Sequence, residues 1–141
     1  MSAELAIKHA RSMLGVQWRH MGRKLWAVDC AGLVILSLEA AGWPKVRAPV
    51  SYGREPWDDQ LRRTLLENLG PPIDDAPKPG DIALVRWGKN EPSHVGIVAD
   101  YVWGGLSIIH SQNLHGVIET ALSERIAECV IEAYRPDWSR V

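Results

Sequence analysis

The residue best placed to do chemistry is Cys30, which follows Asp29 where a polar loop gives way to an almost wholly apolar segment. Asp29 is a suitable N-cap, so a helix is predicted over 30–41 with Cys30 in its first turn. The positive end of the helix dipole favours the thiolate, which is the nucleophilic form of cysteine. With an imidazole in reach, the chain would hold the two essential parts of a cysteine hydrolase.

Two histidines, His94 and His110, each lie in a short β-branched segment that predicts a strand. His94 begins the strand predicted over 94–99, and His110 ends the next one, predicted over 106–110. Because the start of one strand lies opposite the end of the next in a tight hairpin, the two imidazoles are predicted to meet. Gly96 leaves room on the same face for another chain to approach. His94 would act as the base and His110 would orient it.

Each of these residues also has a structural interpretation. A cysteine on a buried helix usually serves as a small apolar side chain, and a histidine on a strand is usually a polar residue with satisfied hydrogen bonds. Cys129, the other cysteine, has no neighbouring cap or basic signal and is predicted to pack. A zinc site made by Cys30, His94 and His110 is a further hypothesis, disfavoured by the wide spacing and the missing Cys-x-x-Cys pair.

The length of 141 residues predicts a single domain over residues 1–141. Sixteen Lys and Arg against seventeen Asp and Glu leave a net charge of −1, which argues against nucleic acid or an anionic membrane as the main partner. The N-terminus, 1–5, lacks the pattern of a secretory signal, and no stretch reaches the roughly 18 apolar residues of a membrane-spanning helix. We therefore expect a protein made in the cytoplasm.

Apolar periodicity places helices first and strands second along the chain. Helices are predicted over 3–14, 30–41 and 59–69. Strands are predicted over 82–87, 94–99, 106–110, 117–120 and 130–134, with a short helix at 121–128 before the last strand. This order predicts an α+β fold in which N-terminal helices pack on an antiparallel sheet of about five to six strands.

Five segments of the chain carry a family resemblance, at 15–22, 29–34, 79–84, 93–97 and 108–110. Together they resemble the NlpC-type cell-wall peptidases, which are cysteine peptidases of papain-like fold, and the likeness extends over about 6–138. It implies a Cys–His–His triad, here Cys30, His94 and His110. It also implies hydrolysis of peptidoglycan stem peptides, often at the bond from D-glutamate to the diamino acid. This chemistry needs no metal or other cofactor.

The chain departs from that family's pattern at two positions. The residue before Arg19 is commonly Tyr, whose phenol could donate to the oxyanion, and here it is Trp18. The residue after the nucleophile is often Ser, which is tied to gripping the substrate, and here it is Ala31. Asp29 is then either a grip for a free amine of the substrate or only a helix cap. His20, in the same loop, could line the cleft.

The short form is most similar to the branch of the family encoded in phage and prophage tail modules. The loop Arg19-His20-x-Gly22-Arg23 carries this likeness. It implies tail-tip proteins as partners and a protein that is incorporated in a virion tail and acts in the cell envelope. The opposing hypothesis is an inert structural tail-tip module that keeps the fold, and the changes at Trp18 and Ala31 motivate it.

Overall fold

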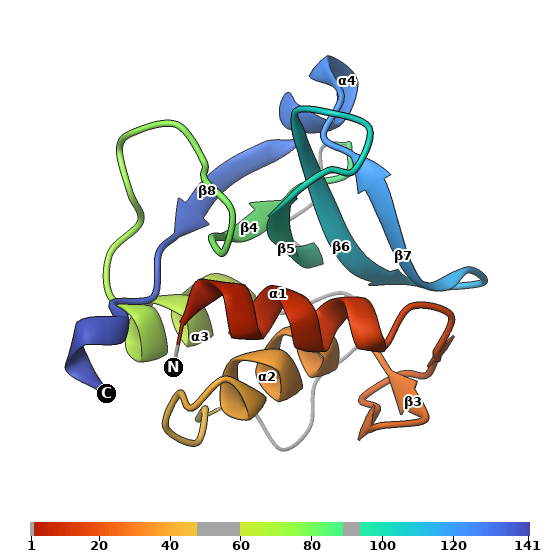
Figure 1. Cartoon of the computed structure of the whole chain (residues 1–141), viewed down its shortest axis with the longest axis horizontal. Coiled ribbons are helices and arrows are strands. Elements are labelled where there is room, and N and C mark those ends of the chain that lie inside the picture. The colour runs from red at the N-terminus through yellow and green to blue at the C-terminus, as the bar shows by residue number, and fades with distance from the viewer. Residues whose placement is uncertain (1, 48–59, 89–93) are drawn as a thin grey trace.

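The computed structural model describes residues 2–47, 60–88 and 94–141, and these form helices followed by an antiparallel sheet (Figure 1). The helices are α1 (Ala3–Ser12), α2 (Cys30–Ala40), α3 (Gln60–Leu69), α4 (Glu124–Ala127) and the 3-10 helix η1 (Trp138–Arg140). The main strands are β4 (Ile82–Val85), β5 (His94–Asp100), β6 (Leu106–Gln112), β7 (Gly116–Ala121) and β8 (Val130–Tyr134). The α+β prediction is confirmed, with five strands in the main sheet.

The main sheet has the strand order β7-β6-β5-β4-β8. Neighbours from β4 to β7 follow the chain, as expected for hairpins joined by short turns. The last strand returns to the opposite edge, where it pairs antiparallel with β4 and places Tyr134 opposite Ile82. The hairpin of β5 and β6 pairs Ile97 with Ile109, and this register decides which side chains of the two strands meet.

The helices α1, α2 and α3 lie on one side of the sheet (Figure 1). The main core fills the space between these layers, and its largest fully buried side chains include Leu33 of α2, Ile97 of β5 and Tyr134 of β8. Burial of each such side chain contributes roughly 2 kcal/mol. The opposite face of the sheet carries a smaller cluster, formed by Ala83, Val85, Val98 and Ile108.

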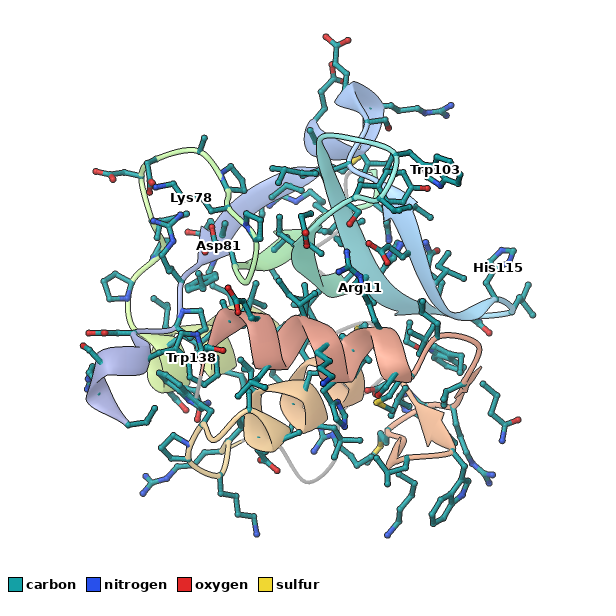
Figure 2. The ribbon with its side chains drawn as sticks, in the orientation of Figure 1. Arg11, Lys78, Asp81, Trp103, His115 and Trp138 are labelled. Carbon is teal, nitrogen blue, oxygen red and sulfur yellow. The ribbon has the colours of Figure 1, made fainter. Side chains whose placement is uncertain are left out.

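An ion pair ties α1 to the edge of the sheet. The Arg11 side chain reaches from the helix toward the strands (Figure 2). Its Nε and one terminal nitrogen donate to the two carboxylate oxygens of Glu119 at 3.1 and 2.9 Å. Ser107 donates to the same carboxylate at 2.7 Å. This planar two-bond contact orients α1 on the strands more strictly than apolar packing alone.

A second, small sheet precedes α2 and was not predicted. It contains β1 (Gln17–Trp18), β2 (Arg23–Lys24) and β3 (Ala27–Val28) in the order β1-β3-β2, with β1 and β3 parallel. Strands of two residues are too short to show an alternating pattern, so the sequence reads as a loop here. None of the described helices is long and apolar enough to span a membrane.

Some predicted bounds also need correction. Helix α1 ends at Ser12 instead of 14, and β4 ends at Val85 instead of 87. The helix predicted over 121–128 covers only Glu124–Ala127, because β7 continues to Ala121 and the Ser123 side chain caps the turn that follows. The first residue of the helix predicted over 59–69 lies outside the described residues.

Candidate active site

Cys30 is the first residue of α2, and the carboxylate of Asp29 fixes how this helix begins. One carboxylate oxygen accepts from the amide of Gly32 at 2.7 Å, which is the N-cap contact. The other accepts from the amide of Met21 at 3.0 Å and so ties the preceding loop to the helix. The predicted cap is confirmed, whereas contact of Asp29 with a substrate amine stays a prediction.

Gly32 allows the loop to lie directly on the first turn of α2. A Cβ at Gly32 would stand only 2.0 Å from the carbonyl oxygen of Gly22. The amide of Asp29 donates to that same oxygen at 3.3 Å. Any side chain at position 32 would therefore push the loop off the helix start. A glycine inside a buried helix, where it costs stability relative to alanine, was the available sequence signal for this contact.

The sheet holds the same helix start from the other side. The hydroxyl of Ser111, on β6, donates to the carbonyl of Val28 at 2.8 Å, and both residues are buried. Val28 lies two positions before Cys30. The nucleophile candidate is thus positioned by the loop, by its own helix and by the strand that carries His110.

The structure brings His94 and His110 together, as the hairpin argument predicts. Nε2 of His94 lies 2.7 Å from Nδ1 of His110, and the side chains are 6% and 1% exposed. Gly96, on the same face, leaves room for the side chain of Ile108, because a Cβ there would stand 2.6 Å from it. His94 lies opposite Val85, so this pair is on the sheet face of the smaller apolar cluster.

Three further side chains surround the histidine pair, and the sequence analysis missed all of them. Nε2 of His110 lies 3.2 Å from the hydroxyl of Thr120, on β7. The amide nitrogen of Gln112 lies 3.4 Å from Nδ1 of His110. The ring of Trp87 stands 5.6 Å from that of His94, centre to centre. Only the register of the strands identifies these neighbours, and no motif in the sequence carries it.

The sulfur of Cys30 lies beside the start of β5. Backbone hydrogen bonds from Val95, Ala31 and Cys30 itself favour the thiolate, and Val95 is the residue that follows His94. Burial acts against them and, together with the charge of Asp29, raises the pKa of Cys30 to about 12. The helix start thus favours the thiolate as predicted, but burial and the charge of Asp29 are larger and keep the resting thiol protonated.

The two histidines are also held neutral. Burial, together with the neighbouring His110, lowers the pKa of His94 to about 3. Burial lowers the pKa of His110 to about 4. A lone thiolate at Cys30 and a lone imidazolium at either histidine are thus both penalised by burial. The resting site favours a neutral thiol and neutral imidazoles.

Trp18 and His20 lie in the segment that packs against the start of α2. Trp18 belongs to β1 and pairs with Val28 of β3, two residues before the cysteine. Its ring stacks with that of His20 at 6.3 Å between centres. The structure thus places both on the loop side of the candidate site, while their contact with an oxyanion or substrate stays a prediction.

Cys129 is half-buried against the smaller apolar cluster, and its thiol points to the carbonyl of Arg125 at 3.6 Å. Its predicted packing role is confirmed, and neither cysteine forms a disulfide. Among the described residues, no group of three or more His, Cys, Asp or Glu side chains is arranged to hold a metal ion. The zinc hypothesis, which needed Cys30, His94 and His110 as ligands, is therefore not supported.

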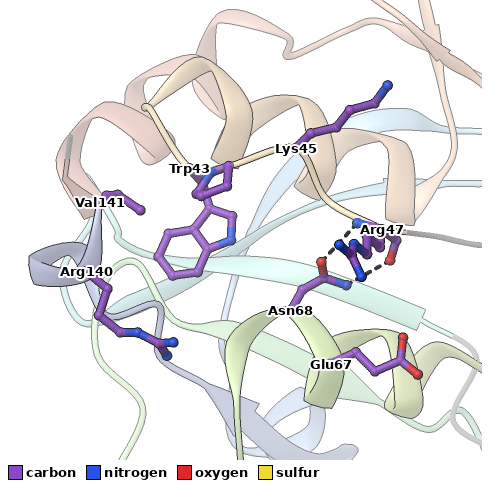
Figure 3. Close-up of a pocket in the computed structure, with 8 residues that line it drawn as sticks. Trp43, Lys45, Arg47, Glu67, Asn68, Arg140 and Val141 are labelled. Atoms are coloured by element: carbon purple, nitrogen blue, oxygen red, sulfur yellow. Dashed lines mark hydrogen bonds between the residues drawn. The ribbon is translucent and has the colours of Figure 1, made fainter.

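A pocket of about 440 Å³ lies beyond the other end of α2 (Figure 3). Trp43 and Arg47 line it on one side, and Asn68 and Arg140 on the other. The side-chain amide of Asn68 donates to the carbonyl of Arg47 at 2.8 Å and accepts from its amide at 2.9 Å. None of the predicted site residues lines this pocket, so it is separate from the candidate active site.

Comparisons with known proteins agree with this arrangement. The model of the NlpC/P60 family matches residues 15–134, while no curated protein matches the chain. A NlpC/P60 family protein from Bacillus cereus ATCC 10987 has a similar structure, with a TM-score of 0.70 and 20% identity. The match covers 96% of this chain but only 40% of that protein.

Two other solved structures are similar. The NlpC/p60 domain of the peptidoglycan hydrolase SagA has a TM-score of 0.66 and 18% identity, with 95% of this chain and 98% of that domain covered. NlpC1 from Trichomonas vaginalis has a TM-score of 0.66 and 19% identity, with 95% and 43% covered. At these identities the structures show the shared fold, and the family model covers most of the chain. The chain belongs to the NlpC/P60 family.

Proposed function

We propose that this chain is a cysteine peptidase that hydrolyses stem peptides of bacterial peptidoglycan. The proposal is supported by the family and by one observation above the others, which is the buried contact of 2.7 Å between His94 and His110. A buried imidazole whose far nitrogen is occupied by a second imidazole has one nitrogen left for proton transfer. The backbone contact of Val95 with the Cys30 sulfur brings the thiol to the strand start that carries this imidazole.

The proposed reaction follows from these positions. Nε2 of His94 is taken by His110, so Nδ1 receives the proton of Cys30 while the sulfur attacks the carbonyl carbon of the substrate. His94 then returns this proton to the leaving amine as the peptide bond breaks, and a thioester remains on Cys30. Water, deprotonated by His94, attacks the thioester, and the proton returns to the thiolate as the acid is released.

The developing oxyanion needs hydrogen-bond donors at its own position. The backbone amide of Cys30 is one candidate, because the first amides of a helix have no acceptor within the helix. The indole of Trp18 is the second candidate, since its strand lies beside the residue that precedes Asp29. Trp18 would replace the tyrosine that is common at this position in the family.

The narrower part of the proposal concerns substrate and location. We propose cleavage of the bond from D-glutamate to the diamino acid, with the protein in the tip of a phage or prophage tail. The resemblance of the Arg19–Arg23 loop to the tail-associated branch supports the location. Antibody against the chain is expected to label purified tail particles, and mass spectrometry of released muropeptides would identify the bond.

The deciding experiment compares Cys30→Ala with Cys129→Ala on purified peptidoglycan. Cys129 packs against the smaller cluster and takes no part in the proposed reaction, so its removal controls for general effects of losing a cysteine. We expect Cys30→Ala to abolish release of peptide fragments and Cys129→Ala to retain it. Undiminished release by Cys30→Ala would refute the assignment.

The second candidate function is an inert structural module of a tail tip. The specific observation in its favour is the burial that raises the pKa of Cys30 to about 12, because an unionised thiol is a poor nucleophile. It predicts that the wild-type chain releases no fragments and that Cys30→Ala leaves assembly of the particle intact. Fragment release by the wild type that depends on Cys30 would exclude it.

A further inference from the structure

We propose that Thr120 is a positioning residue, which holds His110, and through it His94, in the tautomer that can accept the thiol proton. The inference rests on the proposed peptidase function. It assigns a role to a side chain that lies outside the Cys–His–His set and touches neither the sulfur nor the substrate in the reaction described above.

The geometry of the sheet places Thr120 beside His110. In the pairing of β6 with β7, Thr120 lies opposite Ile108, and Ile108 and His110 share one face because they are two residues apart. Thr120 is thus the diagonal neighbour of His110 on that face. Its hydroxyl lies 3.2 Å from Nε2 of the imidazole, on the side away from His94.

The direction of the hydrogen bonds follows from what His94 has to do. To receive a proton on Nδ1, neutral His94 must carry its own hydrogen on Nε2 and donate it to Nδ1 of His110. His110 must then carry its hydrogen on Nε2, where the Thr120 hydroxyl is the acceptor. The opposite direction leaves a hydrogen on Nδ1 of His94, and this nitrogen cannot accept another.

Loss of the Thr120 hydroxyl makes the productive direction costly. The amide nitrogen of Gln112 lies 3.4 Å from Nδ1 and 3.5 Å from Nε2 of His110, and as a donor it cannot replace the hydroxyl as acceptor for a hydrogen on Nε2. In the unproductive direction Nε2 carries no hydrogen, so no buried donor is left unpaired there. His110 is 1% exposed, so bulk water is kept from replacing the lost acceptor.

The test uses Thr120→Val, which keeps the shape of the side chain and removes the hydroxyl, and Thr120→Ser, which keeps the hydroxyl. We expect Thr120→Val to lower kcat on peptidoglycan about 10- to 100-fold with KM unchanged, and Thr120→Ser to stay within about threefold of the wild type. Thr64→Val is the matched control, because the Thr64 hydroxyl donates only to the Gln60 carbonyl within its own helix.

A second readout does not depend on activity. In the resting protein labelled with ¹⁵N-histidine, the ring shifts of His110 should report a hydrogen on Nε2 in the wild type and in Thr120→Ser. They should report a hydrogen on Nδ1 in Thr120→Val. An unchanged tautomer in Thr120→Val, or equal kcat values for the valine variant and the wild type, would overturn the inference.

Failure of the proposed function itself would look different. If the wild type releases no fragments from peptidoglycan, the peptidase proposal fails, whereas the ring shifts still decide whether Thr120 sets the tautomer of His110. If the wild type is active and Thr120→Val keeps the wild-type tautomer, the peptidase proposal stands and the role of Thr120 is refuted.

Discussion

Two buried polar clusters of this fold avoid the free-energy cost of an unpaired buried charge in different ways: one pairs its charges and the other stays neutral. Asp81, directly before β4, is 1% exposed, and both of its oxygens are matched by Arg135 at 2.8 and 2.9 Å. The amide of Lys78 donates to the same carboxylate at 2.7 Å. The hydrogen bonds that the guanidinium donates to Asp81 are the main cause of the raised pKa of Arg135, so the guanidinium stays charged.

The histidine pair is kept neutral instead. His94 and His110 contact each other, and His110 also contacts the hydroxyl of Thr120. Burial lowers the pKa of both rings, to about 3 and about 4. A buried charge that is fully paired stays with its partner, because removing either one leaves the other uncompensated. A buried pair of neutral imidazoles can instead accept a proton, provided that a negative charge forms beside it.

The largest effect on the histidine side of this comparison is expected from His94→Gln. Glutamine can keep a hydrogen bond to His110 but cannot take a proton at neutral pH, so the base is lost. We expect kcat/KM on peptidoglycan to fall about 1000-fold or more. The free energy of unfolding, measured in urea at pH 7, should change by less than about 1 kcal/mol, since one neutral polar group replaces another.

The matched control for this variant is His115→Gln. His115 lies in the turn between β6 and β7, at the edge of the molecule (Figure 2), and takes no part in the proposed reaction. It should behave as the wild type in both measurements. If His94→Gln retained more than a tenth of the wild-type kcat/KM, the histidine pair would have no catalytic role. It would then not differ in function from the cluster of Asp81 and Arg135.

The ion-pair side of the comparison is tested by Asp81→Asn. This variant replaces the carboxylate that the guanidinium of Arg135 contacts twice by a neutral amide, while Asp75 keeps its contact at 3.1 Å. We expect a loss of about 2 kcal/mol in the free energy of unfolding. Activity per folded molecule should be unchanged, because Asp81 takes no part in the proposed proton transfer. The measurements are urea unfolding and kcat under conditions where the variant is folded.

An exposed aspartate provides the reference for that experiment. Asp74 lies in the loop before Asp81 on the surface of the molecule, so Asp74→Asn should leave stability within about 0.5 kcal/mol. A result in which Asp81→Asn kept full stability but lost turnover would reverse the roles assigned to the two clusters.

The same contrast explains what could be predicted from the sequence. The hairpin that joins His94 to His110 is local, with strands that follow each other, so the meeting of the two rings could be predicted. The partner of Asp81 could not, because Arg135 stands 54 positions later and reaches it only through the return of β8 to β4. Thr120 required the register of β6 and β7, which no local pattern specifies.

The ionisation of Cys30 shows a different limit of prediction from the sequence. The sequence correctly predicts a capped helix start, and the dipole of such a start favours a thiolate. The opposing effect is burial, which depends on the loop, the sheet and the helix closing around the sulfur together. The rule for helix starts gives the sign of one contribution to the pKa of Cys30. The tertiary structure decides which contribution to that pKa is larger.

The smallest effect in this series is the pH dependence of stability. Both histidines have folded pKa values below their ordinary value of 6.5, so the unfolded chain binds protons that the folded chain refuses. Their contribution to stability is therefore complete above pH 6.5 and is lost as the pH falls toward 3 to 4. Between pH 7 and pH 5.5 we expect a loss of about 1 kcal/mol for each histidine.

The measurement is urea unfolding of the wild type and of the double variant His94→Gln, His110→Gln at pH 7, 6.25 and 5.5. The double variant should lose less stability over this range, by about 2 kcal/mol, because its buried amides do not titrate. His115→Gln should retain the wild-type dependence, since that histidine lies in a turn at the surface. Equal pH dependence of the wild type and the double variant would mean that the buried rings accept protons as readily as free histidines. The site would then be able to hold a lasting imidazolium, and the thiolate of Cys30 could exist before substrate arrives.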